Sequence, residues 1–469
     1  MNKFFIICSL LTVISLSSCS KNGNLSPEEE RELTFDVKVV KASDLNTKMV
    51  KTDWENGDRI YVYFKKNNSS YLSCNKYVTF TYSSSTNSWV VSKDGCGSSL
   101  SSISTSQIGT SGTMYAVYFP FGNVTPLKDS RWNYDTYRFF YMSGNTNPAL
   151  NNYPPFSFYM LDTGSSYTVS GSTVTGTLTM VLPENFVYFY IDAVDGKYNQ
   201  NEKYRLCVEG VKPATVLKYD SGSFTKLELA EGLPMWGFKY GDGIAFAGII
   251  DNSWSSAADH KFIFFSDGDP AITKTFHDIS LNSHQSVKLK APTASNGWEP
   301  YMTAPEYEEI AEIKWSKWFL GSTSENDVTN LHTFRWAEIV PDKAKDDFDQ
   351  LPIHDLTGDY AIFDPARAIL GADWRMPSRD DFNSLKSNCT LTSNSSWFTF
   401  TFEDKSIKFP SSIATSIYMW TSQKKDNTYI YVEEYHSGEN KLTETSSGTG
   451  NSPKRQYGTN YIRPIYIGE

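Results

Sequence analysis

Alternation of apolar and polar residues constrains the fold of this chain most strongly. Between residues 34 and 39, Phe35, Val37 and Val39 alternate with polar residues, which is the period-two pattern of a strand with one buried face. Similar runs follow, separated by turns rich in Ser, Gly and Asn, and they span 59–64, 77–82, 89–91, 115–119, 174–182, 187–194, 244–250, 261–265 and 286–290. Strands at this spacing, with little helical periodicity before residue 290, predict a mainly β protein built from β-sandwiches.

The composition agrees with this fold class and limits the partners. The chain has 469 residues, enough for two or three domains, and contains 29 Phe, 29 Tyr and 12 Trp, which are residues enriched in strands. Most of these aromatic residues are expected to pack within sheets, although sugar-binding faces also use them. The formal net charge is −10 and the Lys and Arg residues are scattered, so we predict no nucleic-acid partner.

The N-terminus has the layout of an export signal. Lys3 precedes an apolar run from Phe4 to Leu16, which is too short to span a bilayer as a mature helix. The run ends in Leu-Ser-Ser-Cys19, which resembles the lipobox of bacterial lipoproteins and implies a lipid on Cys19 after removal of residues 1–18. We expect a polar tether at 19–33 and a lipid anchor in the cell outer membrane, exposed to the exterior; a periplasmic face and an ordinary signal peptide remain the alternatives.

Four cysteines follow Cys19 in the chain. Export permits disulfides, and four cysteines allow three pairings. Cys74 and Cys96 lie in one Ser-rich region, on either side of the predicted strand 77–82, so we favour a disulfide between them, with Cys207 and Cys389 as buried thiols. No cysteine or histidine spacing matches a metal site, and we predict neither a metal nor a cofactor.

Turn and linker signals along the chain suggest three folded parts. We expect a first β-sandwich at 34–170, a second at 171–291, a linker at 292–304 and an α+β part at 305–469. Residues 183–185, Pro-Glu-Asn, lie between two predicted strands and form either a hairpin turn or a turn that switches sheets. In the last part, Asp364 and Gly371 bracket one short predicted helix, and Ser378 begins another with Asp381 in a capping-box position.

The C-terminal part resembles a known domain. The strings that carry the resemblance are Phe334-Arg335-Trp336, Asp364-Pro365-Ala366, Gly371-Ala372-Asp373-Trp374-Arg375-Met376-Pro377-Ser378, Met419-Trp420-Thr421-Ser422 and Tyr461-Ile462-Arg463-Pro464-Ile465. This succession is similar to the Fibrobacter succinogenes major paralogous domain, whose fold is similar to C-type lectins and to formylglycine-generating-enzyme modules. The resemblance therefore implies a C-type-lectin-like α+β module over 305–469.

Within this module we expect most of the motif residues to serve as scaffold. These residues are Trp336, Asp364, Trp374, Arg375, Pro377, Trp420 and Arg463. Loops within 322–359 and 388–395, with Trp397 as an aromatic anchor, are the expected ligand contacts. The motifs that bind calcium and sugar in calcium-dependent lectins do not occur, and only Cys389 lies here, so neither calcium-dependent sugar binding nor formylglycine-generating oxidase activity is expected.

The N-terminal part resembles a second family. Residues 52–63 contain Trp54-Glu55-Asn56-Gly57-Asp58-Arg59-Ile60, which is similar to the Trp-x-x-Gly-Asp-x-Ile segment of fimbrillin-like lipoproteins of Bacteroidales. That resemblance implies two tandem transthyretin-like β-sandwiches. It also implies assembly by donor-strand exchange, in which a strand of one subunit completes the sheet of its neighbour.

No catalytic constellation stands out, so we predict that the chain is not an enzyme. Residues 162–165, Asp-Thr-Gly-Ser, resemble an aspartic-protease loop, but no convincing second copy exists and we expect a turn. Residues 267–269, Asp-Gly-Asp, are expected to form a hairpin turn and not a calcium site. A glycosidase needs only two facing carboxylates, so that activity stays open.

These observations lead to two functional hypotheses. The first is a surface lipoprotein that acts in adhesion, or as an accessory or tip component of fimbriae, and presents the lectin-like module to a surface protein or glycan. A shaft subunit needs a free C-terminal strand to donate, whereas here another domain follows the sandwiches. The alternative is a surface glycan-binding lipoprotein of a polysaccharide-uptake system.

Overall fold

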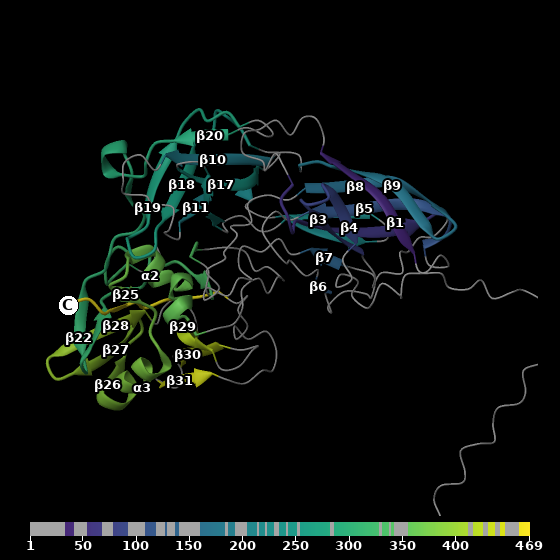
Figure 1. Ribbon diagram of the computed structural model, residues 1–469. Helices are drawn as coiled ribbons and strands as arrows, with labels where there is room; N and C mark the ends of the chain where they lie inside the picture. The colour runs from purple at the N-terminus through teal and green to yellow at the C-terminus, as the bar shows by residue number, and fades with distance from the viewer. Residues whose placement is uncertain are drawn as a thin grey trace, which may run out of the picture.

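The computed structural model describes residues 33–41, 54–67, 78–91, 108–118, 127–128, 137–139, 160–182, 186–192, 204–212, 215–220, 223–228, 234–240, 243–250, 254–281, 286–327, 331–336, 339–341, 355–410, 416–424, 430–436, 441–445 and 459–469. The protein is mainly β, as predicted, and its strands form several separate sheets (Figure 1). Cys19, Cys74 and Cys96, on which the lipidation and disulfide predictions rest, lie outside these ranges. Within them, no helix has the length and apolar character needed to cross a bilayer.

A seven-stranded sheet, here called the β1 sheet, comes first in the order β1-β9-β8-β5-β2-β3-β4. Its strands are β1 (Thr34–Lys41), β2 (Arg59–Lys66), β3 (Val78–Ser83), β4 (Ser88–Val91), β5 (Ser111–Tyr118), β8 (Met160–Ser170) and β9 (Thr173–Met180). The sheet curls so far that its two edge strands, β1 and β4, lie close together. Phe35 of β1 then packs against Phe64 and Phe80 across the enclosed core.

The predicted boundary at residue 171 lies between β8 and β9, two strands of the β1 sheet. β8 and β9 are antiparallel neighbours, with Tyr167 opposite Gly176, and β9 pairs in parallel with β1. The chain changes sheet only between β9 and β10 (Phe186–Asp192), on either side of residues 183–185, which lie outside the described residues. A strand's partners are set by tertiary contacts, so the local turn signal could not assign β9 to a sheet.

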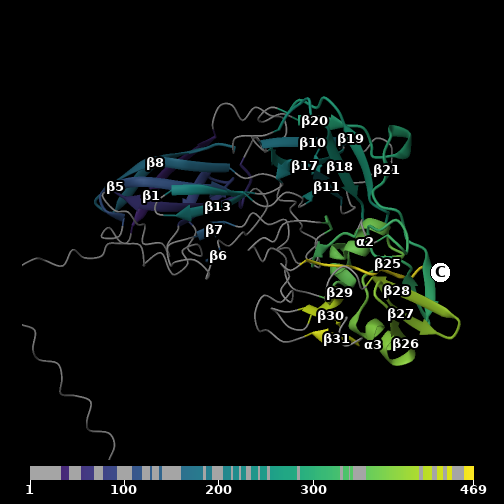
Figure 2. The ribbon, with the colours of Figure 1, turned by 180° about the vertical axis from the view of Figure 1, so that it is seen from behind.

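The second unit is a sandwich of two sheets placed face to face (Figures 1 and 2). The β10 sheet contains β10, β12 (Val211–Lys212), β16 (Phe238–Tyr240), β17 (Gly243–Ile250) and β20 (Ser286–Leu289). The β18 sheet contains β11 (Arg205–Val208), β15 (Met235–Trp236), β18 (His260–Phe265), β19 (Ile272–Phe276) and β21 (Glu299–Pro300). Phe189 of β10 meets Phe262 of β18 edge to face, with ring centroids 5.3 Å apart.

A further small sheet joins segments that are distant in sequence. Its order is β14-β13-β7-β6, formed by β6 (Leu127–Lys128), β7 (Tyr137–Phe139), β13 (Thr215–Asp220) and β14 (Ser223–Glu228). β6 and β7 come from the stretch between β5 and β8, whereas β13 and β14 follow β12. This sheet therefore links the chain of the β1 sheet to that of the second sandwich.

Both sheets of the second sandwich are covered on both faces. Along β10, Val187 and Phe189 point into the sandwich core, while Phe186 and Tyr188 join the core of the β1 sheet. In the β18 sheet, the face opposite the sandwich core packs against the C-terminal module. Strands buried on both faces lack a polar face, which explains the nearly continuous apolar runs of β10 and β17. The β10 sheet therefore shares a core with the β1 sheet, and the β18 sheet shares one with the C-terminal module.

The stretch predicted as a linker, 292–304, is packed onto the second sandwich. It contains the short 3₁₀ turn η2 (Ala294–Asn296), and β21 pairs with β19. Trp298 is 3% exposed and contributes to the sandwich core. The division of the chain into domains stays a prediction, but this segment is part of the folded structure.

The C-terminal module combines short sheets with two helices. The β23 sheet has the order β22-β23-β33-β25, formed by β22 (Tyr307–Ile310), β23 (Ile313–Ser316), β33 (Ile465–Tyr466) and β25 (Trp374–Arg375). The others are β24 (Phe334–Arg335) with β32 (Thr459–Asn460); β26 (Thr390–Ser393), β27 (Trp397–Phe402) and β28 (Lys405–Pro410); and β29 (Ser416–Lys424), β30 (Ile430–His436) and β31 (Lys441–Thr445). The helical segments are η3 (Gly358–Phe363), α2 (Pro365–Leu370) and α3 (Arg379–Asn388).

The two helices confirm the predictions made from their caps. Asp364 caps α2 with Pro365 as its first residue, and Gly371 ends it with a φ of 98°. Ser378 caps α3, and the reciprocal bonds of a capping box with Asp381 are both present. Phe382 and Leu385 form the buried face of α3, as the spacing predicts.

Candidate functional site

The Trp54–Asp58 motif forms a clamp at one end of the β1 sheet. The Trp54 ring meets Trp89 and Tyr118 edge on, with centroids 5.0 Å from each. Asp58 accepts a hydrogen bond from the Glu55 backbone N–H at 2.8 Å, which closes the turn before β2. Burial, with the Asp58 carboxylate nearby, raises the pKa of Tyr118 above its usual range. These residues hold a turn together.

Asp364 ties the start of α2 to β25. Its Oδ1 accepts hydrogen bonds from the backbone N–H groups of Ala366 at 2.8 Å and Arg367 at 3.3 Å, and its Oδ2 accepts from that of Met376 at 2.7 Å. The side chain is 1% exposed, and burial raises its pKa to about 6 against the opposing effect of these bonds and of Arg375. The buried Asp364 carboxylate therefore holds the start of α2 against Met376, the residue after β25.

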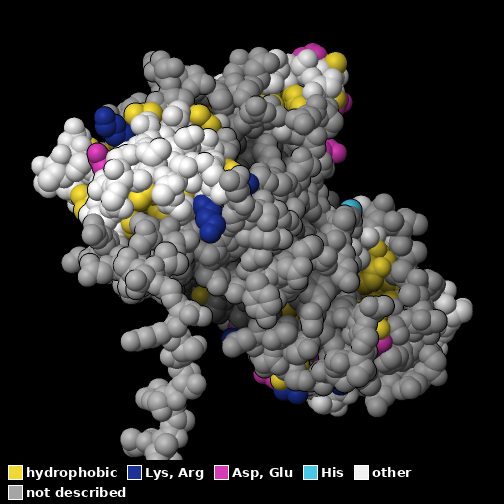
Figure 3. All heavy atoms as spheres, turned by 90° about the vertical axis from the view of Figure 1, so that its right-hand side faces the viewer, with side chains coloured by type: hydrophobic (Ala, Val, Ile, Leu, Met, Phe, Trp, Pro, Cys, Tyr) yellow, Lys and Arg dark blue, Asp and Glu magenta, His cyan; other side chains and the backbone are white. Residues whose placement is uncertain are grey.

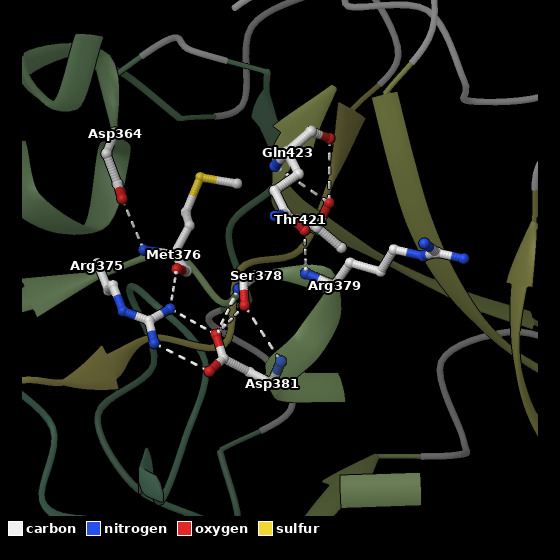
Figure 4. A network of polar contacts seen from close by, with 8 residues as sticks. All are labelled: Asp364, Arg375, Met376, Ser378, Arg379, Asp381, Thr421 and Gln423. Carbon is white, nitrogen blue, oxygen red and sulfur yellow. Dashed lines mark hydrogen bonds and ion pairs between the residues drawn. The ribbon is translucent and has the colours of Figure 1, made fainter. Parts of the chain in front are cut away.

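Arg375 and Asp381 form a bidentate ion pair beside Asp364 (Figure 4). Arg375 Nη1 lies 2.5 Å from Asp381 Oδ2, and Nη2 lies 3.0 Å from Oδ1. Burial acts to raise the pKa of Asp381, but the hydrogen bonds and charge of Arg375, together with the bonds from Ser378, hold it below its usual value. The pair fixes the segment that leads from β25 into α3.

The network continues from α3 to β29 (Figure 4). The Arg379 backbone N–H donates to Gln423 Oε1 at 2.9 Å, and the Thr421 hydroxyl donates to the Tyr431 carbonyl at 2.8 Å. Some contacts of this network are local, such as that of Ser378 with Asp381, and others join α3 to β29. The predicted scaffold role of these residues stays a prediction.

The predicted scaffold tryptophans lie in the module's cores. Trp336 Nε1 donates to the Thr421 carbonyl at 3.2 Å, and Trp420 Nε1 donates to the Phe334 carbonyl at 2.7 Å. Trp374 is 5% exposed, and Pro377 is buried with its carbonyl accepting from the Ser422 N–H.

Arg463 is the most deeply buried cation of the module. Its Nε, Nη1 and Nη2 donate to the carbonyls of Ser316 at 2.7 Å, Lys408 at 2.9 Å and Lys317 at 2.6 Å. The guanidinium also lies over the rings of Phe319 and Phe409, and burial lowers its pKa to about 9. Arg463 thereby joins its own segment to two others, one at Ser316 and Lys317 and one at Lys408.

Trp397, the predicted aromatic anchor, begins β27 opposite Pro410 and is half-buried. Its backbone N–H donates to Asn394 Oδ1 at 2.8 Å, which orders the turn before the strand. The neighbouring residues 392–396 are exposed. A role of Trp397 in ligand binding stays a prediction.

The module docks directly on the β18 sheet. Cys207, Ile263 and Phe265 of that sheet enter the same hydrophobic core as α2 and Trp374. Backbone bonds reinforce the contact: the Ala271 N–H donates to the Ile369 carbonyl at 3.0 Å, and the Ala372 N–H donates to the Gly268 carbonyl at 2.8 Å. The expected Asp-Gly-Asp turn does connect β18 with β19, and it also forms part of this docking surface.

Arg205, which is not among the predicted site residues, crosses this docking surface. Arg205 is 2% exposed and its Nη1 donates to the Ile362 carbonyl of η3 at 2.6 Å. A charged residue inside the apolar run Tyr204–Val208 is the signal that could have revealed it, because a buried cation requires buried acceptors.

The Asp162–Ser165 segment is a β-bulge, so the predicted turn is wrong. The segment lies inside β8, where the pairing with β5 shifts register between Met114 and Ala116. Asp162 is 3% exposed and accepts bonds from the Gly164 N–H, the Ser165 hydroxyl and the Thr179 N–H. A carboxylate satisfied in this way fixes the bulge and has no catalytic geometry.

Other groups that could bind a metal or react were sought among the described residues. Within those ranges, no three His, Cys, Asp or Glu side chains gather in a way that could hold a metal ion. Cys207 is buried as expected, whereas Cys389 is only half-buried, and both are free thiols. On the face in Figure 3, the described Lys and Arg side chains lie apart from one another.

Comparisons with known proteins give distant structural likenesses. No family model matches the chain, and no curated protein matches it. A candidate cell adhesion protein from Bacteroides ovatus is 13% identical, with a TM-score of 0.33 over 55% of this chain and 91% of that one. A fimbrial protein from Bacteroides ovatus is 11% identical, with a TM-score of 0.25 over 92% of this chain and 99% of that one. A candidate polysaccharide-binding protein from Bacteroides thetaiotaomicron is 11% identical, with a TM-score of 0.25 over 50% and 76%. No function follows from likenesses at this level.

Proposed function

We propose that this chain is a lipid-anchored cell-surface protein that acts in adhesion, as an accessory or tip component of fimbriae, and presents its C-terminal module as the contact surface. The observation that carries the proposal is the position of β33. This strand lies between β23 and β25 and pairs with both, and Ile465 within it is 1% exposed. Withdrawing β33 to complete a neighbour's sheet would open the module's core.

The position of β33 favours a terminal component over a shaft subunit. Donor-strand exchange requires a strand that leaves its own sheet, or is free from the outset, and adds to a neighbour's sheet. β33 is held on both edges, whereas β1 is an edge strand that pairs only with β9 among the described strands. A subunit that can accept a strand but keeps β33 belongs at an end of the assembly.

The arrangement of the layers also supports a presenting role. The second sandwich lies between the β1 sheet and the module, and β22 lies on the side of the molecule away from the β1 sheet (Figures 1 and 2). Shared cores at both contacts resist rotation of one part against the next. A module held in this way faces outward from the part that carries the tether.

Localisation on fimbriae tests the proposal directly. The tagged chain would be produced in the bacterium that encodes it, and immunogold labelling would locate the tag on isolated fimbriae. We expect gold at fimbrial ends and co-purification of fimbrial subunits by mass spectrometry. A Cys19→Ala variant is the matched control, because it lacks the predicted lipid site and should leave the membrane fraction.

Two results would contradict the proposal. Gold spaced along the shaft would make the chain a structural subunit in spite of β33. Co-purification of an outer-membrane glycan transporter without fimbrial subunits would favour the alternative, a glycan-binding lipoprotein of a polysaccharide-uptake system.

A further inference from the structure

One aromatic ring is exposed on an otherwise well-packed part of the module. Among the described residues, the exposed large hydrophobic side chains are Val40, Val90, Tyr307 and Ile467. Tyr307, at the start of β22, is 42% exposed and is the aromatic member of this group. β22 itself lies on the side of the module away from the β1 sheet (Figure 1).

The Tyr307 ring is held in place by a series of rings that leads into the core. It stacks on Tyr466 with centroids 4.6 Å apart and an interplanar angle of 5°. Tyr466 in turn meets Trp374 edge on at 5.2 Å, and Trp374 is buried. One face of Tyr307 is therefore occupied by Tyr466, and the ring is fixed in advance of any ligand, which lowers the entropic cost of binding.

Polar groups lie in a row beside this ring. Directly opposed residues of antiparallel strands share a sheet face, so the pairs Glu309–Lys314, Lys314–Tyr466 and Tyr466–Trp374 form one row across the β23 sheet. Tyr307 is two residues from Glu309 and shares that face. Lys314 Nζ lies 5.6 Å from the Tyr307 centroid and is positioned by a 2.8 Å hydrogen bond to the Gly468 carbonyl.

We propose that Tyr307, with Lys314 and Glu309, forms a subsite for a neutral pyranose ring of a saccharide. The C–H groups on one face of a pyranose stack on the negative face of an aromatic ring. Sugar hydroxyls both donate and accept hydrogen bonds, which suits the Lys314 ammonium near the ring and a carboxylate, Glu309, on the same face of the sheet. This inference rests on the proposed function and names the class of ligand that the module would contact.

The charges around the ring favour a neutral ligand over the alternatives. The Lys314 ammonium beside the ring repels a cationic ligand, which would otherwise bind an aromatic face. An anionic ligand would be attracted by Lys314, but the Glu309 carboxylate opposite Lys314 and the chain's net charge of −10 weaken that attraction. A polyol carries no charge, so neither effect applies to it.

Binding by the full-length chain would be measured with saturation-transfer difference NMR. The probes are neutral hexasaccharides of glucose, mannose or galactose. A single ring with a few hydroxyl contacts supports dissociation constants on the order of 1 mM. We expect at least one probe to bind. Tyr307→Ala should weaken that binding by about tenfold or more, because it removes the stacking surface.

Two control variants make this test specific. Tyr307→Phe keeps the ring and should bind within about threefold of wild type, since only the hydroxyl is lost. Ile467→Ala changes an exposed side chain that directly follows Tyr466 in the chain, just after β33. It should leave binding unchanged. Thermal unfolding of each variant shows whether the module remains folded.

Absence of binding by every probe, or equal binding by wild type and Tyr307→Ala, would overturn the subsite. So would capture of a protein partner through Tyr307 with no saccharide binding, which would make this face a protein-docking surface. Immunogold labelling of the Tyr307→Ala chain separates this proposal from the previous one. Fimbrial ends labelled by a chain that binds no saccharide leave the fimbrial role standing and remove only the subsite.

Discussion

Arg205 of β11 donates a hydrogen bond from Nη1 to the carbonyl of Ile362 in η3, 157 residues further along the chain. The guanidinium also lies 5.6 Å from the ring centroid of Phe265. The bond crosses the contact between the second sandwich and the C-terminal module, inside a core to which both contribute. The two parts are therefore expected to unfold as one cooperative unit.

Replacing Arg205 tests this coupling. Arg205→Met keeps much of the apolar stem but leaves the buried Ile362 carbonyl without its donor, and should lower the free energy of unfolding by about 2–4 kcal/mol. Arg205→Lys retains a charge and should fall between that variant and wild type. Urea unfolding followed by Trp fluorescence measures both. Two separated transitions in wild type would show that the parts unfold independently.

The raised pKa of Asp364 predicts that the free energy of unfolding depends on pH. Its folded pKa of about 6 is above the ordinary value of 3.8, so the folded state binds the proton more tightly than the unfolded state. The stability contributed by protonation is complete below the unfolded pKa and is lost as pH rises through 6. Relative to Asp364→Asn, which cannot titrate, wild type should gain about 2 kcal/mol between pH 7 and pH 4.

The comparison with Asp364→Asn isolates this group, because other carboxyls titrate alike in both chains. Chemical denaturation at several pH values gives the difference in unfolding free energy. Parallel pH profiles for the two chains would mean that Asp364 has an ordinary pKa in the folded state.

Lys386 and Glu433 form a buried ion pair between α3 and β30. Lys386 Nζ lies 2.9 Å and 3.0 Å from the two carboxylate oxygens of Glu433, whose side chain is 0% exposed. Lys386→Met removes this cation from beside the buried carboxylate and should cost about 3–5 kcal/mol. The double variant Lys386→Met/Glu433→Gln removes the charge as well and should recover more than half of that loss. A double variant no more stable than Lys386→Met would assign the loss to packing.

Arg463 should be the most sensitive position of the module. Arg463→Met removes the hydrogen-bond donors to three carbonyls, and we expect a loss of about 4 kcal/mol or more, or failure to fold. Arg463→Lys keeps the charge, but a single ammonium cannot replace a planar fork that reaches three carbonyls, so about 2 kcal/mol should be lost. Thermal denaturation measures both, and a Lys variant as stable as wild type would exclude the role of the fork.

Local signals predicted local structure well. The caps at Asp364 and Ser378 place α2 and α3 correctly, because a cap is decided by hydrogen bonds within about four residues. The same reasoning failed at Asp162, where the residues of a turn form a bulge inside β8. A bulge depends on the opposite strand, here β5, and that strand lies far away in sequence.

The candidate site was predicted only in part. Trp374, Trp420 and Arg463 were expected to be scaffold and lie buried, consistent with their types and motif. Tyr307 gave no signal, because its exposure and its stacking on Tyr466 depend on the pairing of β22 and β23 with β33. Strands separated by about 150 residues come together there. The hydrogen bond from Lys314 to Gly468, for example, joins residues that are 154 positions apart in the chain.

The sequence by itself determined the mainly β class, the positions of many strands and the two capped helices, because alternation and capping act over a few neighbouring residues. Only the tertiary structure decided which strands share a sheet, placing β9 with β1 and β33 between β23 and β25. It also decided that the β10 and β18 sheets are buried on both faces, so that adjoining parts share cores. Such contacts join residues far apart in the chain, and their free energy comes from surfaces that exist only once the sheets have formed.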